Sequence, residues 1–150
     1  MSTPTDTASK LVIGWREWIH LPELGLPPIK AKVDTGARTS ALHAFELDVE
    51  ETADGPFVNF AIHPEQGPDS VVARVRAPIV DQREVTDSGG HKEERYVITT
   101  PVAIAGNQWP IELTLTTRDT MRFRMLLGRT AMRGRILVDP AASYLGNARA

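Results

Sequence analysis

The stretch that decides the fold is Lys32-Val33-Asp34-Thr35-Gly36-Ala37, in which a carboxylate follows directly on a β-branched strand residue. A catalytic carboxylate has to lie at a rigid strand end, where nearby hydrogen-bond donors can hold its charge. Asp34 supplies the carboxylate, and Thr35 can offer its hydroxyl to a facing loop. Gly36 has no Cβ, so its N–H can approach the carboxylate closely. We therefore expect Asp34, Thr35 and Gly36 to be catalytic residues.

A triplet of Asp, Thr and Gly also occurs in ordinary hairpins and strand-end turns, where all three residues are common. A second feature favours the catalytic interpretation. Residues 123–129 predict a short strand that ends in Leu126, Leu127 and Gly128, before a small helical turn around residues 130–132. In retroviral-type aspartic proteases, an apolar-apolar-Gly strand of this kind runs beside the Asp-Thr-Gly strand and packs under the catalytic loop. We expect these three residues to support the site.

The rest of the chain predicts a mainly β protein. Residues 96–104 and 109–116 alternate between apolar and polar positions, and the turn residues 105–107 between them predict a hairpin. Further strands are expected over residues 12–19, 28–33, 45–49, 57–62, 71–80 and 136–138. This order is similar to that of a retropepsin, so we predict a small, partly closed retropepsin-like (acid-protease) β barrel with one or two short helices.

Long stretches of the chain resemble a retropepsin-like bacterial family that is often labelled "ATP-dependent zinc protease" and associated with RimK-type ATP-grasp ligases. The stretches that carry the resemblance are residues 13–18, 21–25 and 29–43. The resemblance implies an aspartic peptidase domain with a functional link to an ATP-grasp glutamate ligase. Lys32 departs from retropepsins, in which an apolar residue often precedes the motif, so the packing of the strand near Asp34 is expected to differ.

The family label names ATP and zinc, and each would require recognisable residues in the sequence. The sequence has no Gly-x-x-x-x-Gly-Lys-Ser/Thr loop to hold phosphates, so ATP dependence has no support. The chain has no cysteine, and the histidines lack His-Glu-x-x-His spacing. A zinc site assembled only in space stays open, with His43 as its candidate, although a surface or hydrogen-bonded histidine is the simpler expectation. We predict neither a metal nor a cofactor.

Aspartic proteolysis needs two carboxylates that share a proton, one ionised to activate water and one protonated to polarise the substrate carbonyl. The chain contains one Asp-Thr-Gly, so the simplest second carboxylate is Asp34 of another copy in a symmetric homodimer. Asp87-Ser88-Gly89 is the alternative spelling of the triplet, but the polar residues before it do not predict an apolar strand. We expect a flap hairpin there instead, over residues 83–95.

Substrate contacts are expected from both sides of the predicted cleft. Ala37 and Arg38 follow the catalytic triplet, and Ser88, Gly89 and Gly90 form the tip of the flap. Basic residues also bracket the motif, and we expect them to favour acidic, glutamate-rich peptides. These are Lys30, Lys32 and Arg38. The alternative is that they form an ordinary solvated face.

Composition is typical of one small domain. The chain has 150 residues, 41% of them hydrophobic, with 17 basic and 19 acidic residues and a formal charge of −2. We predict a disordered tail over residues 1–10 and a domain over residues 11–145. The near-neutral charge argues against nucleic-acid binding, and no apolar run is long enough to span a membrane. The absence of cysteine suits a reducing cytoplasm.

These observations predict an aspartic endopeptidase in which Asp34, paired across a homodimer, activates water to hydrolyse a peptide bond. One alternative is a catalytically silent retropepsin-like domain that serves as a binding or adaptor module, because a fold does not guarantee chemistry. A zinc-dependent peptidase is the third possibility.

Overall fold

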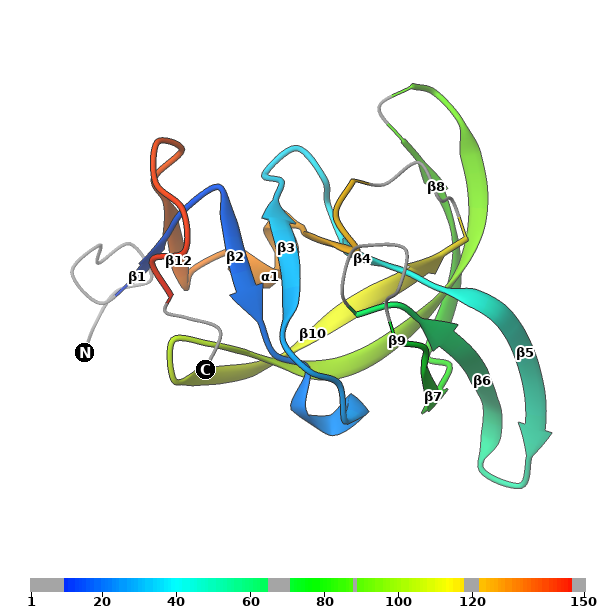
Figure 1. Ribbon diagram of the computed structural model, residues 1–150. Coiled ribbons are helices and arrows are strands. Elements are labelled where there is room, and N and C mark those ends of the chain that lie inside the picture. Colours follow the sequence, from blue (N-terminus) through cyan, green and yellow to red (C-terminus); the bar gives the residue numbers. More distant parts are fainter. Residues whose placement is uncertain (1–9, 65–70, 88, 118–121, 147–150) are drawn as a thin grey trace.

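The structure, a computed structural model, describes residues 10–64, 71–87, 89–117 and 122–146 (Figure 1). Most of the tail expected over residues 1–10 therefore lies outside the described residues. The described elements are β1 (Leu11–Ile13), β2 (Arg16–Ile19), a 3₁₀ helix (Pro22–Leu24), β3 (Ile29–Val33), β4 (Ser40–His43), β5 (Phe45–Thr52), β6 (Gly55–Ile62), β7 (Ala73–Pro78), β8 (Asp81–Thr86), β9 (Lys92–Ile104), β10 (Asn107–Thr116), β11 (Met125–Leu127), α1 (Arg129–Met132) and β12 (Ile136–Val138). The prediction of a mainly β fold with one or two short helices is confirmed.

The main sheet has seven strands in the order β2-β3-β11-β4-β10-β9-β8. The short strand β11 lies between β3 and β4, parallel to β3 and antiparallel to β4. Strands β5, β6 and β7 form a second sheet, and the parallel pair β1 and β12 forms a third. Figure 1 shows β2 and β3 side by side, with the β5–β6 hairpin projecting at the lower right. Among the described residues, β2 and β8 are the two ends of this strand order, so the strands do not form a closed barrel. One isolated bridge links the two sides, because His20, directly after β2, pairs with Ala103 of β9.

The strand predicted over residues 12–19 is in fact two strands, β1 and β2. The chain bends between them because Gly14 passes against the C-terminal segment. A Cβ on Gly14 would lie 2.2 Å from the carbonyl oxygen of Ala142. The bend lets β1 pair with β12 while β2 pairs with β3. The predicted hairpin of residues 96–104 and 109–116 is confirmed, since β9 and β10 are antiparallel neighbours.

The core forms on one face of the main sheet. Along β3, Ile29, Ala31 and Val33 are buried, whereas the alternate residues Lys30 and Lys32 point to the other face. The largest fully buried side chains come from all three sheets and the loop before the 3₁₀ helix: Phe60, Ile13, Ile19, Leu21, Ile29, Leu42, Ile62, Ile98, Ile104, Leu113, Leu115 and Met125.

The three tryptophans differ in how deeply they are buried. Trp109 is buried and its indole Nε1 donates a hydrogen bond to the carbonyl oxygen of Ala131 at 2.9 Å. Trp15 and Trp18 are only half-buried, beside the outer face of β2. Trp109 is therefore part of the core, whereas the other two are partly exposed at the surface.

Candidate active site

The Asp34 turn begins where β3 ends. The backbone N–H of Asp34 donates to the carbonyl oxygen of Leu127 at 2.9 Å, which extends the β3–β11 ladder by one residue. One oxygen of the Asp34 carboxylate, Oδ1, accepts hydrogen bonds from the N–H groups of Gly36 at 3.0 Å and Ala37 at 3.2 Å. A Cβ on Gly36 would lie 3.3 Å from Oδ1, a close approach that glycine avoids. Thr35 and Gly36 are exposed.

The segment after β11 holds the Asp34 turn in place. The N–H of Arg129 donates to the carbonyl oxygen of Ala37 at 2.8 Å, and the N–H of Thr130 donates to that of Arg38 at 3.0 Å. The guanidinium Nη1 of Arg129 donates to the carbonyl oxygen of Gly36 at 3.1 Å. The carbonyl oxygens of the three consecutive residues 36–38 thus accept hydrogen bonds from the first turn of α1. These bonds join the loop after Asp34 to the segment that follows β11, and the supporting role of Leu126, Leu127 and Gly128 stays a prediction.

Gly128 lies at the closest contact between the two segments. A Cβ there would come within 2.6 Å of the carbonyl carbon of Thr39 and 2.9 Å of the nitrogen of Ser40. The N–H of Gly128 donates to Ser40 Oγ at 3.0 Å, a bond that the missing side chain makes possible. Position 128 therefore requires glycine because two backbone segments meet there. Leu127 is fully buried and Leu126 is half-buried on the opposite face.

The hairpin predicted over residues 83–95 is formed by β8 and β9 and rises at the upper right of Figure 1, whereas its role as a flap stays a prediction. Asp87 stabilises its tip. Asp87 Oδ1 accepts hydrogen bonds from the N–H groups of Gly89 and His91, each at 2.9 Å. Gly90 has a positive φ of 84°, as a tight turn requires. Ser88 lies outside the described residues. The Asp87 carboxylate thus accepts hydrogen bonds from the backbone of its own turn, as aspartates in ordinary turns do.

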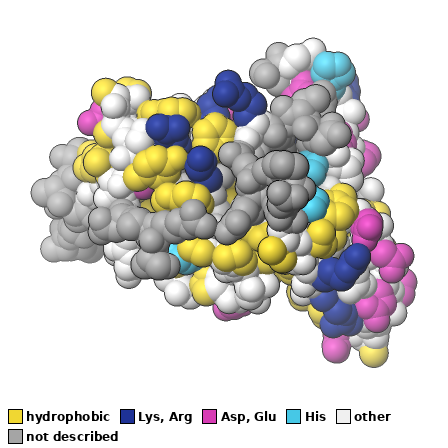
Figure 2. Space-filling model, in the orientation of Figure 1, with side chains coloured by type: hydrophobic (Ala, Val, Ile, Leu, Met, Phe, Trp, Pro, Cys, Tyr) yellow, Lys and Arg dark blue, Asp and Glu magenta, His cyan; other side chains and the backbone are white. Residues whose placement is uncertain are grey.

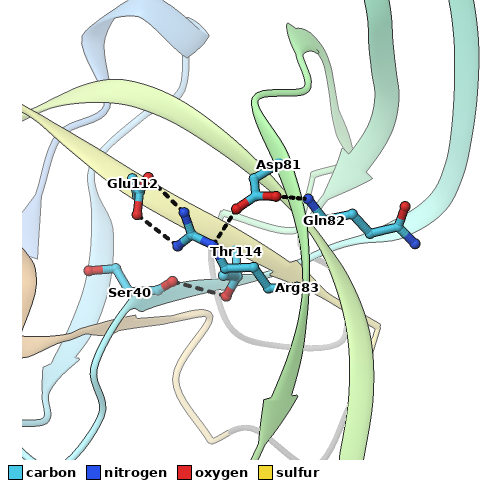
Figure 3. A network of polar contacts seen from close by, with 6 residues as sticks. All are labelled: Ser40, Asp81, Gln82, Arg83, Glu112 and Thr114. Atoms are coloured by element: carbon cyan, nitrogen blue, oxygen red, sulfur yellow. Dashed lines mark hydrogen bonds and ion pairs between the residues drawn. The ribbon is translucent and has the colours of Figure 1, made fainter.

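A network of ionised side chains joins the base of the flap to the sheet beside the Asp34 turn (Figure 3). The guanidinium of Arg83 on β8 makes two parallel hydrogen bonds to Glu112 on β10, at 2.8 and 2.9 Å, and a third to Asp81 at 2.6 Å. The hydrogen bond from Arg83 is the main cause that lowers the pKa of Glu112, and the positive charge of Arg38 adds to it. Arg38 therefore acts electrostatically on this network.

A second pair is more deeply placed beneath the flap. Arg95 on β9 is 8% exposed, and its Nε donates to Glu93 at 2.7 Å. Burial alone would raise the pKa of the Glu93 carboxyl, but hydrogen bonds from Thr116 and Arg95 outweigh burial and lower it. Arg95 also contacts Thr114, whose hydroxyl donates to the carbonyl oxygen of Ser40 at 3.0 Å. Ser40 Oγ also accepts the N–H of Gly128. A continuous series of polar contacts therefore connects Glu93, at the base of the β8–β9 hairpin, with Gly128 beside the Asp34 turn.

The structure distributes the three basic residues predicted to select acidic substrates over two places. Lys30 and Lys32 lie on the outer face of β3, opposite Trp18 and Arg16 of β2 respectively. Arg38 lies in the loop after the turn, on the side of Glu112. Arg16 was not singled out from the sequence, because its position opposite Lys32 depends on the register of β2 and β3.

Glu17 is a second residue that the sequence did not reveal. Its side chain is fully buried, and its carboxylate accepts three backbone hydrogen bonds, from Gly14 at 2.7 Å and from Leu145 and Gly146 at 2.8 Å each. The adjoining Trp15 carbonyl accepts the N–H of Val33 at 2.8 Å. Glu17 thereby ties the C-terminal segment to the strand pair that carries Asp34. The one signal in the sequence is an acidic residue at an inward position of a strand.

The histidines do not gather into a metal site within the described ranges. No group of three or more His, Asp or Glu side chains there is arranged to hold a metal ion. His43 is buried on β4, and His63 stacks on Phe45 with ring centroids 4.8 Å apart. Across the same described ranges, no helix has the length and apolar character needed to cross a membrane.

Comparison with known proteins agrees with this geometry. A family model described as "Retropepsin-like aspartic endopeptidase RimB" matches residues 12–148. A protein named probable alpha-L-glutamate ligase from Parasynechococcus marenigrum is 50% identical over 141 residues, which are 93% of this chain and 30% of that protein. A protein of the same name from Shewanella pealeana is 46% identical over 136 residues, again 30% of its length. The chain thus spans about a third of the length of these curated relatives.

A solved structure supports the same fold. A Legionella pneumophila protein of unknown function superposes with a TM-score of 0.77 and 24% sequence identity, covering 93% of this chain and 100% of that one. At this identity the likeness concerns the fold alone. The family model, in contrast, covers nearly the whole chain, including the Asp34 turn and Gly128. The chain therefore belongs to the RimB-like family of retropepsin-like aspartic endopeptidases.

Proposed function

We propose that the protein is an aspartic endopeptidase that uses Asp34 to activate a water molecule for peptide-bond hydrolysis. The observation that carries the proposal is the Asp34 turn itself. A partly exposed carboxylate accepts two backbone N–H groups on one oxygen and is fixed at a strand end by β11 and α1. A carboxylate held in this way has the fixed position that a general base requires.

The second carboxylate of the mechanism would come from a homodimer. One chain supplies one Asp34, and the other candidate, Asp87, already accepts two hydrogen bonds within its own turn. In a symmetric dimer the two Asp34 carboxylates would meet across the twofold axis and share one proton. The exposed Thr35 hydroxyl would be available to the facing turn. The β8–β9 hairpin would close over the substrate as a flap, with Gly89 and Gly90 at its tip.

The curated relatives suggest the substrate. Proteins named alpha-L-glutamate ligase carry a segment 44–50% identical to this chain within about 30% of their length. A peptidase linked to a ligase of this kind would act on the glutamate-rich peptides that the ligase makes. Such a peptide is highly anionic, so cations in the cleft would attract it.

The same comparison supports a second candidate function. A domain that occurs within a ligase could bind the ligase's product without cleaving it, and act as an adaptor. The two functions differ in the role of Asp34. An adaptor needs the cleft but not a general base, so it would keep peptide binding after Asp34 is replaced.

The experiment that separates the two uses wild type and Asp34→Asn with a mixed peptide library, after the mass of each protein in solution has been measured. The endopeptidase function predicts a dimer and a loss of cleavage of about a hundredfold to ten-thousandfold in the variant, the range expected for a general base. The variant should fold and dimerise as wild type does. A protein that binds but never cleaves glutamate-rich peptides would establish the adaptor instead.

A further inference from the structure

Two cations lie directly opposite each other on the strands that lead to the candidate active site. Arg16 of β2 and Lys32 of β3 are partners in the antiparallel register. Side chains in such positions have their Cβ atoms about 4.5–5.5 Å apart, and like charges there repel each other. The pair therefore costs stability, which an anion bound between the two side chains would offset.

Neither cation has a carboxylate partner within the described part of the chain. The ion pairs found there involve Arg74, Arg76, Arg83, His91, Lys92 and Arg95. Arg16 is held by neutral groups instead. Its Nε donates to Ser143 Oγ at 3.2 Å, and its guanidinium lies 4.7 Å from the ring centroid of Trp15 and 5.1 Å from that of Tyr144. Arg16 is thus fixed in place, whereas Lys32 is exposed.

The pair lies one strand repeat from Asp34. The hydrogen bond from Asp34 to Leu127 continues the ladder of β3, so Asp34 and Lys32 lie on the same face, about 7 Å apart along the strand. Leu126, half-buried, is the partner of Lys32 on the other side. Arg16, Lys32 and Leu126 are therefore the first row of side chains beside Asp34 on the face away from the core.

The surface as a whole has an uneven charge distribution. Figure 2 shows Lys and Arg side chains among hydrophobic ones over the area of β2 and β3, and most of the visible acidic side chains over the β5–β6 hairpin at the lower right. The acidic residues of that hairpin are Glu46, Asp48, Glu50, Glu51 and Asp54. Lys and Arg side chains also lie beside that hairpin, where Arg74 and Arg76 pair with Glu46 and Glu50. Arg16 and Lys32 have no such partner in the described ranges, so their charges are available to an anionic peptide.

We propose that Arg16 and Lys32 form an anion subsite that binds the side-chain carboxylate of the substrate residue next to the scissile bond. The subsite rests on the proposed endopeptidase function, and it names the residues that select the substrate. Arg16 offers a fixed planar fork and Lys32 a mobile point charge, a combination that suits one carboxylate.

Two other cations are less suited to this role. Lys30 lies one strand repeat farther from Asp34, and its ammonium lies 5.7 Å from the ring centroid of Trp18. Arg38 lies within electrostatic range of a carboxylate of the protein itself, since its charge contributes to the low pKa of Glu112. Lys30, which the sequence grouped with Lys32 in substrate selection, is therefore placed outside the subsite. It serves as a matched control for Lys32, because it has the same chemistry and lies on the same face of the same strand.

The test compares wild type, Lys32→Met, Lys32→Glu and the control Lys30→Met. The probes are fluorogenic peptides of equal length with six Glu, six Gln or six Lys residues between donor and quencher. We expect Lys32→Met to reduce the ratio of kcat/KM for the Glu peptide to that for the Gln peptide by about tenfold, mainly through KM. Lys32→Glu should shift the preference toward the Lys peptide, and Lys30→Met should change the ratio by less than about twofold.

A stability measurement separates substrate selection from structural damage. Removing one of two like charges relieves repulsion, so Lys32→Met should unfold at the same temperature as wild type or higher. An unchanged Glu-to-Gln ratio in Lys32→Met and Lys32→Glu, with wild-type cleavage intact, would overturn the subsite and leave the endopeptidase standing. If wild type cleaves none of the peptides nor any member of a mixed library, the proposed function fails, and the subsite fails with it.

Discussion

The backbone N–H of Asp34 lies 2.9 Å from the carbonyl oxygen of Leu127, and this single hydrogen bond joins the candidate catalytic carboxylate to the strand that supports it. The two residues are far apart in the sequence but occupy adjacent ends of parallel strands. Beyond it, bonds from Arg129 and Thr130 hold the following loop. The position of Asp34 thus depends on β11 and α1 as much as on its own strand.

Replacing Gly128 by alanine should disturb this arrangement. A Cβ within 2.6 Å of the Thr39 carbonyl carbon would force two backbone segments apart. We expect Gly128→Ala to lower the free energy of unfolding by about 1–3 kcal/mol, the usual cost of overpacking. Peptide cleavage should fall as well, because the Asp34 turn moves with Gly128. Urea unfolding and a peptidase assay provide the two measurements.

The control for that variant is Thr130→Ala, two residues farther along and exposed. It leaves the backbone bond to Arg38 in place, so stability should change by less than about 0.5 kcal/mol. If Gly128→Ala were as stable and as active as Thr130→Ala, the close contact at Gly128 would not be what positions the turn.

Replacing Glu17 by glutamine should release the C-terminal segment. The buried carboxylate accepts three N–H groups, and a glutamine would direct its NH₂ group against one of these donors. We expect a loss of about 1–3 kcal/mol in the free energy of unfolding, the cost of leaving buried polar groups unpaired. Hydrogen exchange at the amides of Leu145 and Gly146 should become faster. Glu23→Gln, at an exposed position, is the control. Unchanged hydrogen exchange in Glu17→Gln would contradict the role of Glu17 in holding the C-terminal segment.

The Arg83–Glu112 pair predicts a pH dependence of stability. The pKa of Glu112 in the folded protein lies below its ordinary value of 4.5, chiefly because of the hydrogen bond from Arg83. The stabilisation is therefore complete above about pH 4.5 and is lost as the pH falls through the lower, folded-state value. Glu112→Gln should be less stable than wild type at neutral pH, and the difference should shrink below pH 4.5. A difference that persists undiminished in strong acid would show that ionisation of Glu112 is not its source.

Replacing Asp87 by asparagine tests the role assigned to the hairpin tip. The asparagine oxygen can still accept the N–H groups of Gly89 and His91, so the turn should persist. We expect cleavage to fall by less than about tenfold, as for a residue that does not transfer protons. A loss as large as that of Asp34→Asn, in a variant that is folded and dimeric, would mean that Asp87 is a catalytic carboxylate.

Local patterns in the sequence predicted most of the strands, but not β4. Alternation over β9 and β10, with Gly106 between them, predicts their hairpin, and an apolar pair before Gly128 predicts the strand beside β3. Local patterns cannot reveal a bend that depends on a distant contact, so the break at Gly14 against Ala142 was missed.

The side-chain partners were also beyond prediction from the sequence. Arg83 and Glu112 are 29 residues apart, and their meeting depends on how β8, β9 and β10 pair. Likewise, Arg16 faces Lys32 only in one register of β2 and β3. The sequence identified the motif and a basic flank, and the sheet register decides which cations lie beside Asp34.

The most direct test of a shared catalytic site is to mix a fixed amount of wild type with increasing amounts of Asp34→Asn and to follow peptide cleavage after the chains have exchanged. If each active site needs Asp34 from two copies, excess variant captures wild-type chains in inactive pairs. Cleavage should then fall in proportion to the remaining wild-type pairs, to about a tenth at a ninefold excess. Cleavage that stays constant at every ratio would contradict the paired-aspartate site and show that one chain is sufficient.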